Sequence, residues 1–287
     1  MSHRTLLSSA ILAEHLQDSN WRIFDCRHLL TDAAAGQQAY AAGHLPGAFF
    51  LHLDDDLSGP MNGRNGRHPL PDPQRLADRI GAAGVSTGTQ VVAYDDAGGA
   101  FAARLWWLLR WIGHDQVALL DGGIAAWLAD GRPLTTAVPH AQPATLPVRQ
   151  RDWVVSTEDV LSNLARQRFR LIDARSADRF RGENETLDPV GGHIPGASNR
   201  FFRDNLDADG RFRTAAELRR EFTELLGGLD PRDVVMSCGS GVTACHNLLA
   251  MELAGLAGAR LYAGSWSEWC SDPARPMATC PTPAAAA

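Results

Sequence analysis

The chain contains 287 residues, enough for two domains of average size that each bury a core of their own. Its formal net charge of −6 and pI near 5.9 argue against the basic surfaces that bind nucleic acids or membrane headgroups, so we expect neither partner. The N-terminal segment 1–20 is interrupted by charged residues, and no later stretch is apolar enough to span a bilayer, so we expect a cytoplasmic protein.

The cysteines indicate free thiols rather than a disulfide framework or a zinc site. Their number is odd, and the chain has neither a Cys-X-X-Cys pair nor a Cys/His spacing typical of zinc. We therefore expect no metal and no cofactor, and the question becomes which thiol is reactive. The five are Cys26, Cys238, Cys245, Cys270 and Cys280.

Four signals follow one another in the first half of the chain. They are an apolar run ending in Asp-X-Arg at 23–27, a Gly-His-X-Pro-Gly-Ala turn at 43–48, a second apolar run at 91–95, and Leu-Leu-Asp-Gly-Gly at 119–123. Short apolar runs bounded by turn residues predict buried strands of a parallel sheet. The pattern at 100–111 predicts a helix between the last two signals, so this half predicts an α/β domain.

The same four signals recur, in the same order, in the second half of the chain. A proline-rich segment without apolar periodicity, 135–150, separates the two halves and predicts a linker. The later copies begin at Leu171, Gly192, Val234 and Leu261, with helical patterns at 215–226 and 242–253. We therefore predict two tandem α/β domains, each a mainly parallel sheet flanked by helices, over 1–137 and 153–287, with a linker over 138–152.

Cys238 is the cysteine whose surroundings predict chemistry. It follows a predicted strand and begins Cys-Gly-Ser-Gly-Val-Thr-Ala, which continues into a helical pattern. The two glycines allow successive N–H groups to point inward, and the following helix directs its positive end to the same place. Such a loop holds an anion and favours thiolate over thiol, so we predict a nucleophile. Cys26 and Cys245 lie instead at predicted core positions.

Asp95 occupies the position of Cys238 in the first copy, within Tyr-Asp-Asp-Ala-Gly-Gly. A carboxylate cannot serve as a nucleophile that accepts a sulfur atom. We therefore predict that the first domain keeps the fold but is catalytically inactive.

These motifs resemble those of the rhodanese superfamily, over nearly the whole chain and with the active cysteine in the second domain. The cysteine loop is similar to that of 3-mercaptopyruvate sulfurtransferases, whereas thiosulfate sulfurtransferases carry Arg and Lys where this chain has Gly239 and Ser240. The resemblance implies a sulfurtransferase that carries sulfur as a persulfide on Cys238. The donor-binding loop it implies consists of Gly239, Ser240, Gly241, Val242 and Thr243.

The resemblance also implies one donor-binding arginine outside the loop, Arg179, which would hold the carboxylate of the donor. Mercaptopyruvate enzymes carry a second arginine nine residues later, and this chain has Asp188 there. Arg181, Arg200 and Arg203 are candidates to replace it, and the sequence does not choose among them.

An Asp and a His of the first domain complete the implied site. At the family positions this chain has Asp54 and His68, which would form a proton-handling set with Ser240. The expected function is transfer of sulfur from 3-mercaptopyruvate to cyanide, a thiol or thioredoxin, with release of pyruvate. Three alternatives stay open: a thiosulfate:cyanide sulfurtransferase, a persulfide carrier without turnover, and a cysteine phosphatase. The last is disfavoured because Ala244 stands where such loops end in Arg.

Overall fold

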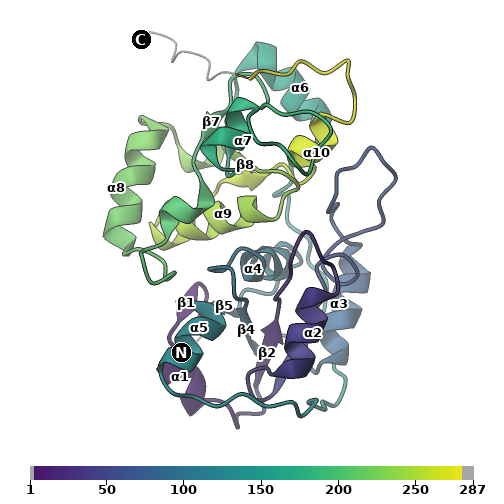
Figure 1. Ribbon diagram of the computed structural model, residues 1–287, viewed down its shortest axis with the longest axis vertical. Coiled ribbons are helices and arrows are strands. Elements are labelled where there is room, and N and C mark those ends of the chain that lie inside the picture. Colours follow the sequence, from purple (N-terminus) through teal and green to yellow (C-terminus); the bar gives the residue numbers. More distant parts are fainter. Residues whose placement is uncertain (1–2, 280–287) are drawn as a thin grey trace. The chain divides into compact units, whose positions relative to one another are not determined.

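The computed structural model describes residues 3–279, which fold into two compact units (Figure 1). Unit 1 comprises residues 3–59, 70–152 and 206–212, and unit 2 comprises 60–69, 153–205 and 213–279. Cys280 lies outside the described residues. Within the described range, none of the helices has the length and apolar character needed to cross a membrane.

Unit 1 is built on a parallel sheet of five strands in the order β1-β5-β4-β2-β3. The strands are β1 (Leu6–Leu7), β2 (Trp21–Asp25), β3 (Ala48–Phe50), β4 (Gln90–Tyr94) and β5 (Val117–Leu120). The helices are α1 (Ser9–Glu14), α2 (Ala35–Ala42), α3 (Pro73–Ala82), α4 (Ala102–Trp111) and α5 (Gly123–Ala129). Strand β4 is buried along its whole length, as its continuous apolar sequence predicts.

Unit 2 repeats this arrangement with a parallel sheet of four strands in the order β7-β6-β8-β9. The strands are β6 (Arg170–Asp173), β7 (Ser198–Asn199), β8 (Val234–Ser237) and β9 (Arg260–Leu261). The helices are α6 (Thr157–Arg166), α7 (Ala177–Arg181), α8 (Ala215–Leu226), α9 (Thr243–Leu253) and α10 (Ser265–Trp269), with 3₁₀ turns η1 (Phe202–Asn205) and η2 (Pro231–Asp233). The prediction of two mainly parallel α/β sheets is confirmed.

The arginine of the Asp-X-Arg motif makes equivalent hydrogen bonds in both units. In unit 2, Arg175 donates to the Asp173 carboxylate at 2.7 Å and to the carbonyl oxygen of Gly192 at 2.6 Å. Arg27 makes the equivalent bonds in unit 1, at 2.6 and 2.8 Å. Each arginine therefore ties the end of a central strand to the start of the Gly-His-X-Pro-Gly turn, which explains why the two motifs recur together.

Two short segments belong to the unit of the opposite half of the chain. Residues 60–69 pack with unit 2, and residues 206–212 pack with unit 1. The first segment is held where the backbone N–H of Arg67 donates to Ser267 Oγ at 3.1 Å. Gly66 has a φ of +82°, and a β-carbon there would lie 2.9 Å from the carbonyl oxygen of Gly264. A glycine is therefore required for this close approach.

Candidate active site

The cysteine loop joins β8 to α9 in unit 2, where Cys238 is buried at the end of the strand. The N–H of Gly241 donates to Cys238 Sγ at 3.1 Å, so the loop supplies a backbone donor to the sulfur. The backbone N–H of Cys238 donates to Ser265 Oγ at 3.0 Å, and its carbonyl oxygen accepts from the N–H of Trp266 at 3.0 Å. Hydrogen bonds therefore hold the Cys238 backbone on both sides, one from the Ser265 hydroxyl and one from the backbone of Trp266.

Gly241 cannot be replaced without moving the loop. Its φ is +77°, and a β-carbon would lie 2.3 Å from the carbonyl oxygen of Ala263. The loop thus rests directly on the chain that follows β9. This contact explains the second glycine of the motif.

Ser265 is a functional candidate that the sequence reasoning missed. It is fully buried and has a φ of +54°, a backbone conformation that residues other than glycine rarely adopt. Its hydroxyl accepts from the Cys238 N–H and donates to the carbonyl oxygen of Tyr262 at 2.9 Å. The signal was available, because the repeat aligns Ser265 with Gly123, whose φ is +56°.

Arg175 supplies positive charge beside the thiol. Burial alone would lower its pKa, but Asp173, Glu185 and Cys238 outweigh burial and raise the pKa of Arg175. The guanidinium therefore stays charged. Its orientation is fixed by Asp173 at 2.7 Å and Glu185 at 3.5 Å.

His68 and Ser240 lie side by side in unit 2. The Nδ1 atom of His68 is 2.7 Å from Ser240 Oγ, and both side chains are buried. The pair can exchange a proton, and Ser240 lies two residues after Cys238 in the chain. The segment 60–69 brings His68 to this unit, although it precedes Ser240 by 172 residues.

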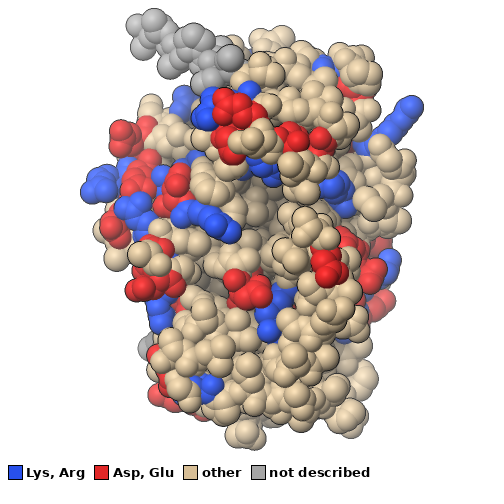
Figure 2. Space-filling view, in the orientation of Figure 1, with Lys and Arg blue, Asp and Glu red and all other residues tan. Residues whose placement is uncertain are grey.

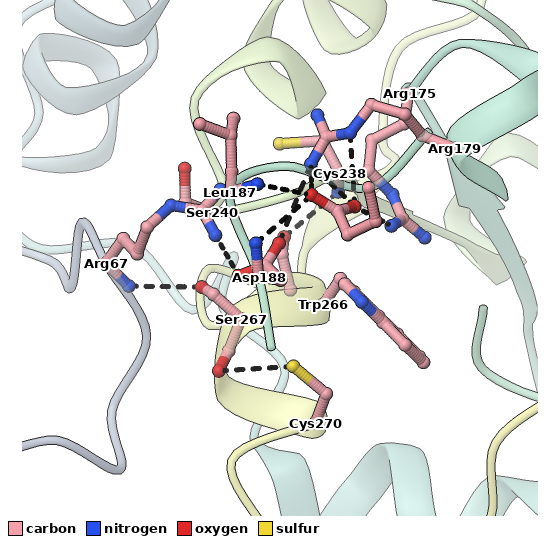
Figure 3. A network of polar contacts seen from close by, with 12 residues as sticks. Arg67, Arg175, Arg179, Leu187, Asp188, Cys238, Ser240, Trp266, Ser267 and Cys270 are labelled. Carbon is pink, nitrogen blue, oxygen red and sulfur yellow. Dashed lines mark hydrogen bonds and ion pairs between the residues drawn. The ribbon is translucent and has the colours of Figure 1, made fainter. Parts of the chain in front are cut away.

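Arg179, on α7, is held by a carboxylate of the following loop. It donates Nη2 to Glu185 Oε1 at 2.8 Å and Nε to Oε2 at 3.1 Å. Asp188, where a second arginine was expected from the resemblance, pairs with Arg67 and lies 3.6 Å from Arg179 (Figure 3). Burial raises the pKa of Asp188, although Arg67 opposes this effect.

The other arginines considered at this place have partners elsewhere in unit 2. Arg181 pairs with Glu183 at 2.8 Å and is exposed at the C-terminal end of α7. Arg200 pairs with Glu221 at 2.8 Å, and Arg203 lies over the ring of Phe202.

Asp54 belongs to unit 1, where its backbone N–H donates to His52 Nδ1 at 3.2 Å. Its carboxylate forms, with His52 and His28, a group of ligand atoms within 4.8 Å of one another. A metal does not fit there, because both nitrogens of His52 are already used: Nδ1 faces backbone N–H groups and Nε2 is 2.9 Å from the carbonyl oxygen of Ala33. The role of Asp54 in proton transfer stays a prediction.

The corresponding loop of unit 1 holds an anion of its own. The Asp95 carboxylate accepts backbone N–H groups at 2.8–2.9 Å. The donors are Ala97, Gly99, Phe101 and Ala102. Burial raises the pKa of Asp95 and these four bonds oppose the rise. In unit 1 the loop after this strand therefore binds a carboxylate of its own chain, and in unit 2 the equivalent loop directs the N–H of Gly241 at Cys238 Sγ.

Asp95→Ala should lower the free energy of unfolding of unit 1 by about 3 kcal/mol or more, because it leaves several buried N–H groups without an acceptor. Asp95→Asn, which keeps one carbonyl oxygen, should cost less. Urea unfolding of the purified variants measures both. Equal stability of wild type and Asp95→Ala would contradict this account of the loop.

On the face seen in Figure 2, acidic and basic side chains are interspersed rather than gathered into a single basic area. This distribution matches the modest net negative charge of the sequence. It offers no electrostatic footprint for a polyanion on that face.

Comparison with known proteins identifies two copies of the rhodanese-like domain, over residues 8–130 and 156–272. The chain is 48% identical over 282 residues to a probable 3-mercaptopyruvate sulfurtransferase from Pseudomonas aeruginosa, covering 97% of this chain and 99% of the relative. It is 34% identical to a thiosulfate sulfurtransferase from Cricetulus griseus, over 93% of this chain and 92% of the relative.

Solved structures agree with these relatives. The 3-mercaptopyruvate sulfurtransferase from Leishmania major superposes with a TM-score of 0.82 at 33% identity, over 93% of this chain and 74% of that one. A crystal structure from Escherichia coli, described with the rhodanese fold and catalytic mechanism of 3-mercaptopyruvate sulfotransferases, gives 0.77 at 33% identity, over 93% and 100% of the two chains. With two matched domains that together span most of its length, the chain belongs to the rhodanese-like domain family.

Proposed function

We propose that this protein is a sulfurtransferase that moves sulfur from 3-mercaptopyruvate to a thiophilic acceptor through a persulfide on Cys238. The cysteine loop carries this proposal, because its Gly241 N–H points at the sulfur and Arg175 lies beside it. The name of the Pseudomonas aeruginosa relative, which matches over nearly the whole length of both chains, supports the same donor.

In the first step, the Cys238 thiolate attacks the sulfur atom of 3-mercaptopyruvate. An S–S bond forms, the C–S bond of the donor breaks, and its electron pair stays on carbon as the enolate of pyruvate. The proton released from the donor thiol returns to that carbon, so pyruvate leaves without an added oxidant or reductant. The N–H groups from Gly239 to Thr243 stabilise the persulfide anion.

The proton passes through Ser240 and His68. Their 2.7 Å contact lets the imidazole give a proton to the hydroxyl as the hydroxyl gives its own to the developing enolate. Asp54 assists this pair in the proposed reaction. Arg179 binds the carboxylate of the donor, as a bidentate guanidinium suits that group.

In the second step, the acceptor attacks the outer sulfur of the persulfide and regenerates the Cys238 thiolate. Cyanide leaves as thiocyanate, and a thiol or reduced thioredoxin leaves as its own persulfide. These acceptors exist in the cytoplasm, where we place the protein, and neither nucleic acid nor membrane takes part in the cycle.

Thiosulfate is the second candidate donor, and the similarity to the thiosulfate sulfurtransferase of Cricetulus griseus favours it. The two donors are separated by specificity constants measured on the same preparation with cyanide as acceptor. We expect a kcat/KM for 3-mercaptopyruvate at least about 10-fold above that for thiosulfate, since one or two charge-assisted contacts amount to that factor. The reverse order would make thiosulfate the donor.

The direct test is to incubate the protein with 3-mercaptopyruvate in the absence of acceptor. Intact-mass measurement should show one added sulfur atom per chain, mapped to the Cys238 peptide, and an equimolar amount of pyruvate. Adding cyanide should remove the sulfur as thiocyanate. A protein that loads once but never turns over would be a persulfide carrier, and one that releases phosphate from an aryl phosphate would be a phosphatase.

His68→Gln should lower kcat for 3-mercaptopyruvate about 10-fold or more, because positioned proton transfer contributes at least that much. The effect should fall on pyruvate release rather than on transfer to cyanide, which needs no proton. Single-turnover measurements of the two half-reactions separate them. Equal losses in both would indicate that His68 only positions the loop through Ser240.

A further inference from the structure

Arg67 lies in the cysteine site although nothing in its local sequence predicts this. Its segment crosses to unit 2, its backbone N–H is bonded to Ser267, and its Nη1 donates to Asp188. Figure 3 shows it approaching Asp188 from the side opposite to Arg179. Asp188 thus lies between two guanidinium groups, at the place where the sequence lacks an arginine.

Nη2 of Arg67 and Nη2 of Arg179, which also bonds to Glu185, both approach Gly239, the residue after Cys238. A β-carbon added at Gly239 would lie 2.9 Å from Nη2 of Arg67 and 3.8 Å from Nη2 of Arg179. The absence of a side chain at Gly239 therefore lets the Arg67 guanidinium pack against the cysteine loop, with Nη2 of Arg179 close to the same residue. A donor carboxylate bound by both guanidinium groups would accept hydrogen bonds from each and would lie near the residue that follows Cys238.

We propose that Arg67 is the second donor-binding residue of this enzyme, closing with Arg179 on the carboxylate of 3-mercaptopyruvate over Gly239, and that Asp188 is its positioning residue. The inference rests on the proposed function and adds the residue that completes the donor site. It also explains why the second half of the chain can carry Asp188: the arginine comes from the segment 60–69, and the acid holds it.

The charges of this network favour a donor with a single negative charge. Three arginines, Arg67, Arg175 and Arg179, contact three carboxylates, Asp173, Glu185 and Asp188. The pairs leave no surplus positive charge, so a second charge on the donor gains little on entering the site. A carboxylate with a keto group gains the two guanidinium hydrogen bonds and brings only one charge to desolvate. The dianion thiosulfate brings two charges to desolvate.

Arg67→Ala should raise KM for 3-mercaptopyruvate about 10- to 100-fold, the range of one charge-assisted hydrogen bond to a carboxylate. The kcat should change much less, because the nucleophile and His68 stay in place. Arg67→Lys should recover only part of the loss, since an ammonium lacks the planar fork. Arg64→Ala, an exposed arginine of the same segment, is the matched control and should leave both constants unchanged.

Binding of pyruvate to Cys238→Ser protein, followed by calorimetry, tests the clamp without turnover. The added Arg67→Ala change should weaken pyruvate binding by a factor similar to the change in KM, while far-UV circular dichroism and the melting temperature show that the protein remains folded. Asp188→Asn tests the positioning residue: the ratio of kcat/KM for thiosulfate to that for 3-mercaptopyruvate should rise about 10-fold, as one negative charge leaves the site.

The inference and the proposed function fail in different ways. Wild-type protein that gains no sulfur from 3-mercaptopyruvate would overturn the function, whatever Arg67 does. Wild-type protein that turns over, together with an Arg67→Ala variant whose KM and pyruvate affinity stay within about 2-fold, would overturn the clamp alone. If the ratio of kcat/KM for thiosulfate to that for 3-mercaptopyruvate is unchanged in Asp188→Asn, the proposed role of Asp188 is wrong.

Discussion

Replacing Cys238 by serine is expected to slow pyruvate release from 3-mercaptopyruvate by about four orders of magnitude or more, the scale on which enzymes lose activity with their nucleophile. A serine hydroxyl is far less ionised at neutral pH, and its oxygen does not form a stable link to the transferred sulfur. The Gly241 N–H that faces Cys238 Sγ at 3.1 Å would still find an acceptor, so the fold should persist. Coupled measurement of pyruvate production gives the rate.

Cys270→Ala is the matched control for this loss. Cys270 is buried in the same unit, and burial raises the pKa of its thiol to about 11, so it stays protonated at neutral pH. Its replacement should leave turnover within about 3-fold of wild type. Comparable losses in both variants would mean that the activity depends on packing in unit 2 rather than on one thiolate.

Most of the fold followed from the repeat, because parallel strands and Gly-rich turns leave local signals in the sequence. The apolar runs, the paired Asp-X-Arg motifs and the helix at 215–226 each depend on neighbours within a few residues. The exchange of residues 60–69 and 206–212 between the units left no such signal. The segment 60–69 is Gly-rich and has no apolar periodicity, so its sequence does not indicate with which of the two units it packs.

The candidate site was predictable only where its chemistry is local. The Cys238 loop carries its glycines and its helix start within a few residues, so backbone geometry alone suggested an anion site. Arg67 and Asp188 are 121 residues apart, and their ion pair leaves no trace in composition or spacing. The candidates that the sequence offers lie near Arg179, where Arg181 and Arg200 pair with other carboxylates and Arg203 lies over the ring of Phe202.

Ser265 shows a different limit of sequence reading. The repeat aligned it with Gly123, and the two positions share a left-handed conformation. A serine there is strained, at a cost of the order of 1 kcal/mol. In unit 2 the hydroxyl of this serine accepts the backbone N–H of Cys238. A departure from the expected glycine was the only sign of this role.

Gly241→Ala is expected to lower kcat/KM for 3-mercaptopyruvate by about 100-fold or more, because small misplacements of reacting groups cost that much. The added methyl would lie 2.3 Å from the carbonyl oxygen of Ala263, at a φ of +77°. The loop must shift, and the N–H that faces Cys238 Sγ moves with it.

Gly196→Ala is the matched control: its φ is +80°, and nothing lies within 4 Å of the added carbon. The positive φ should cost each variant about 1 kcal/mol in urea unfolding, and Gly241→Ala should lose more because of its contact with Ala263. Only Gly241→Ala should lose sulfur loading of Cys238. Equal activity losses in the two variants would assign the effect to strain and not to the anion-binding loop.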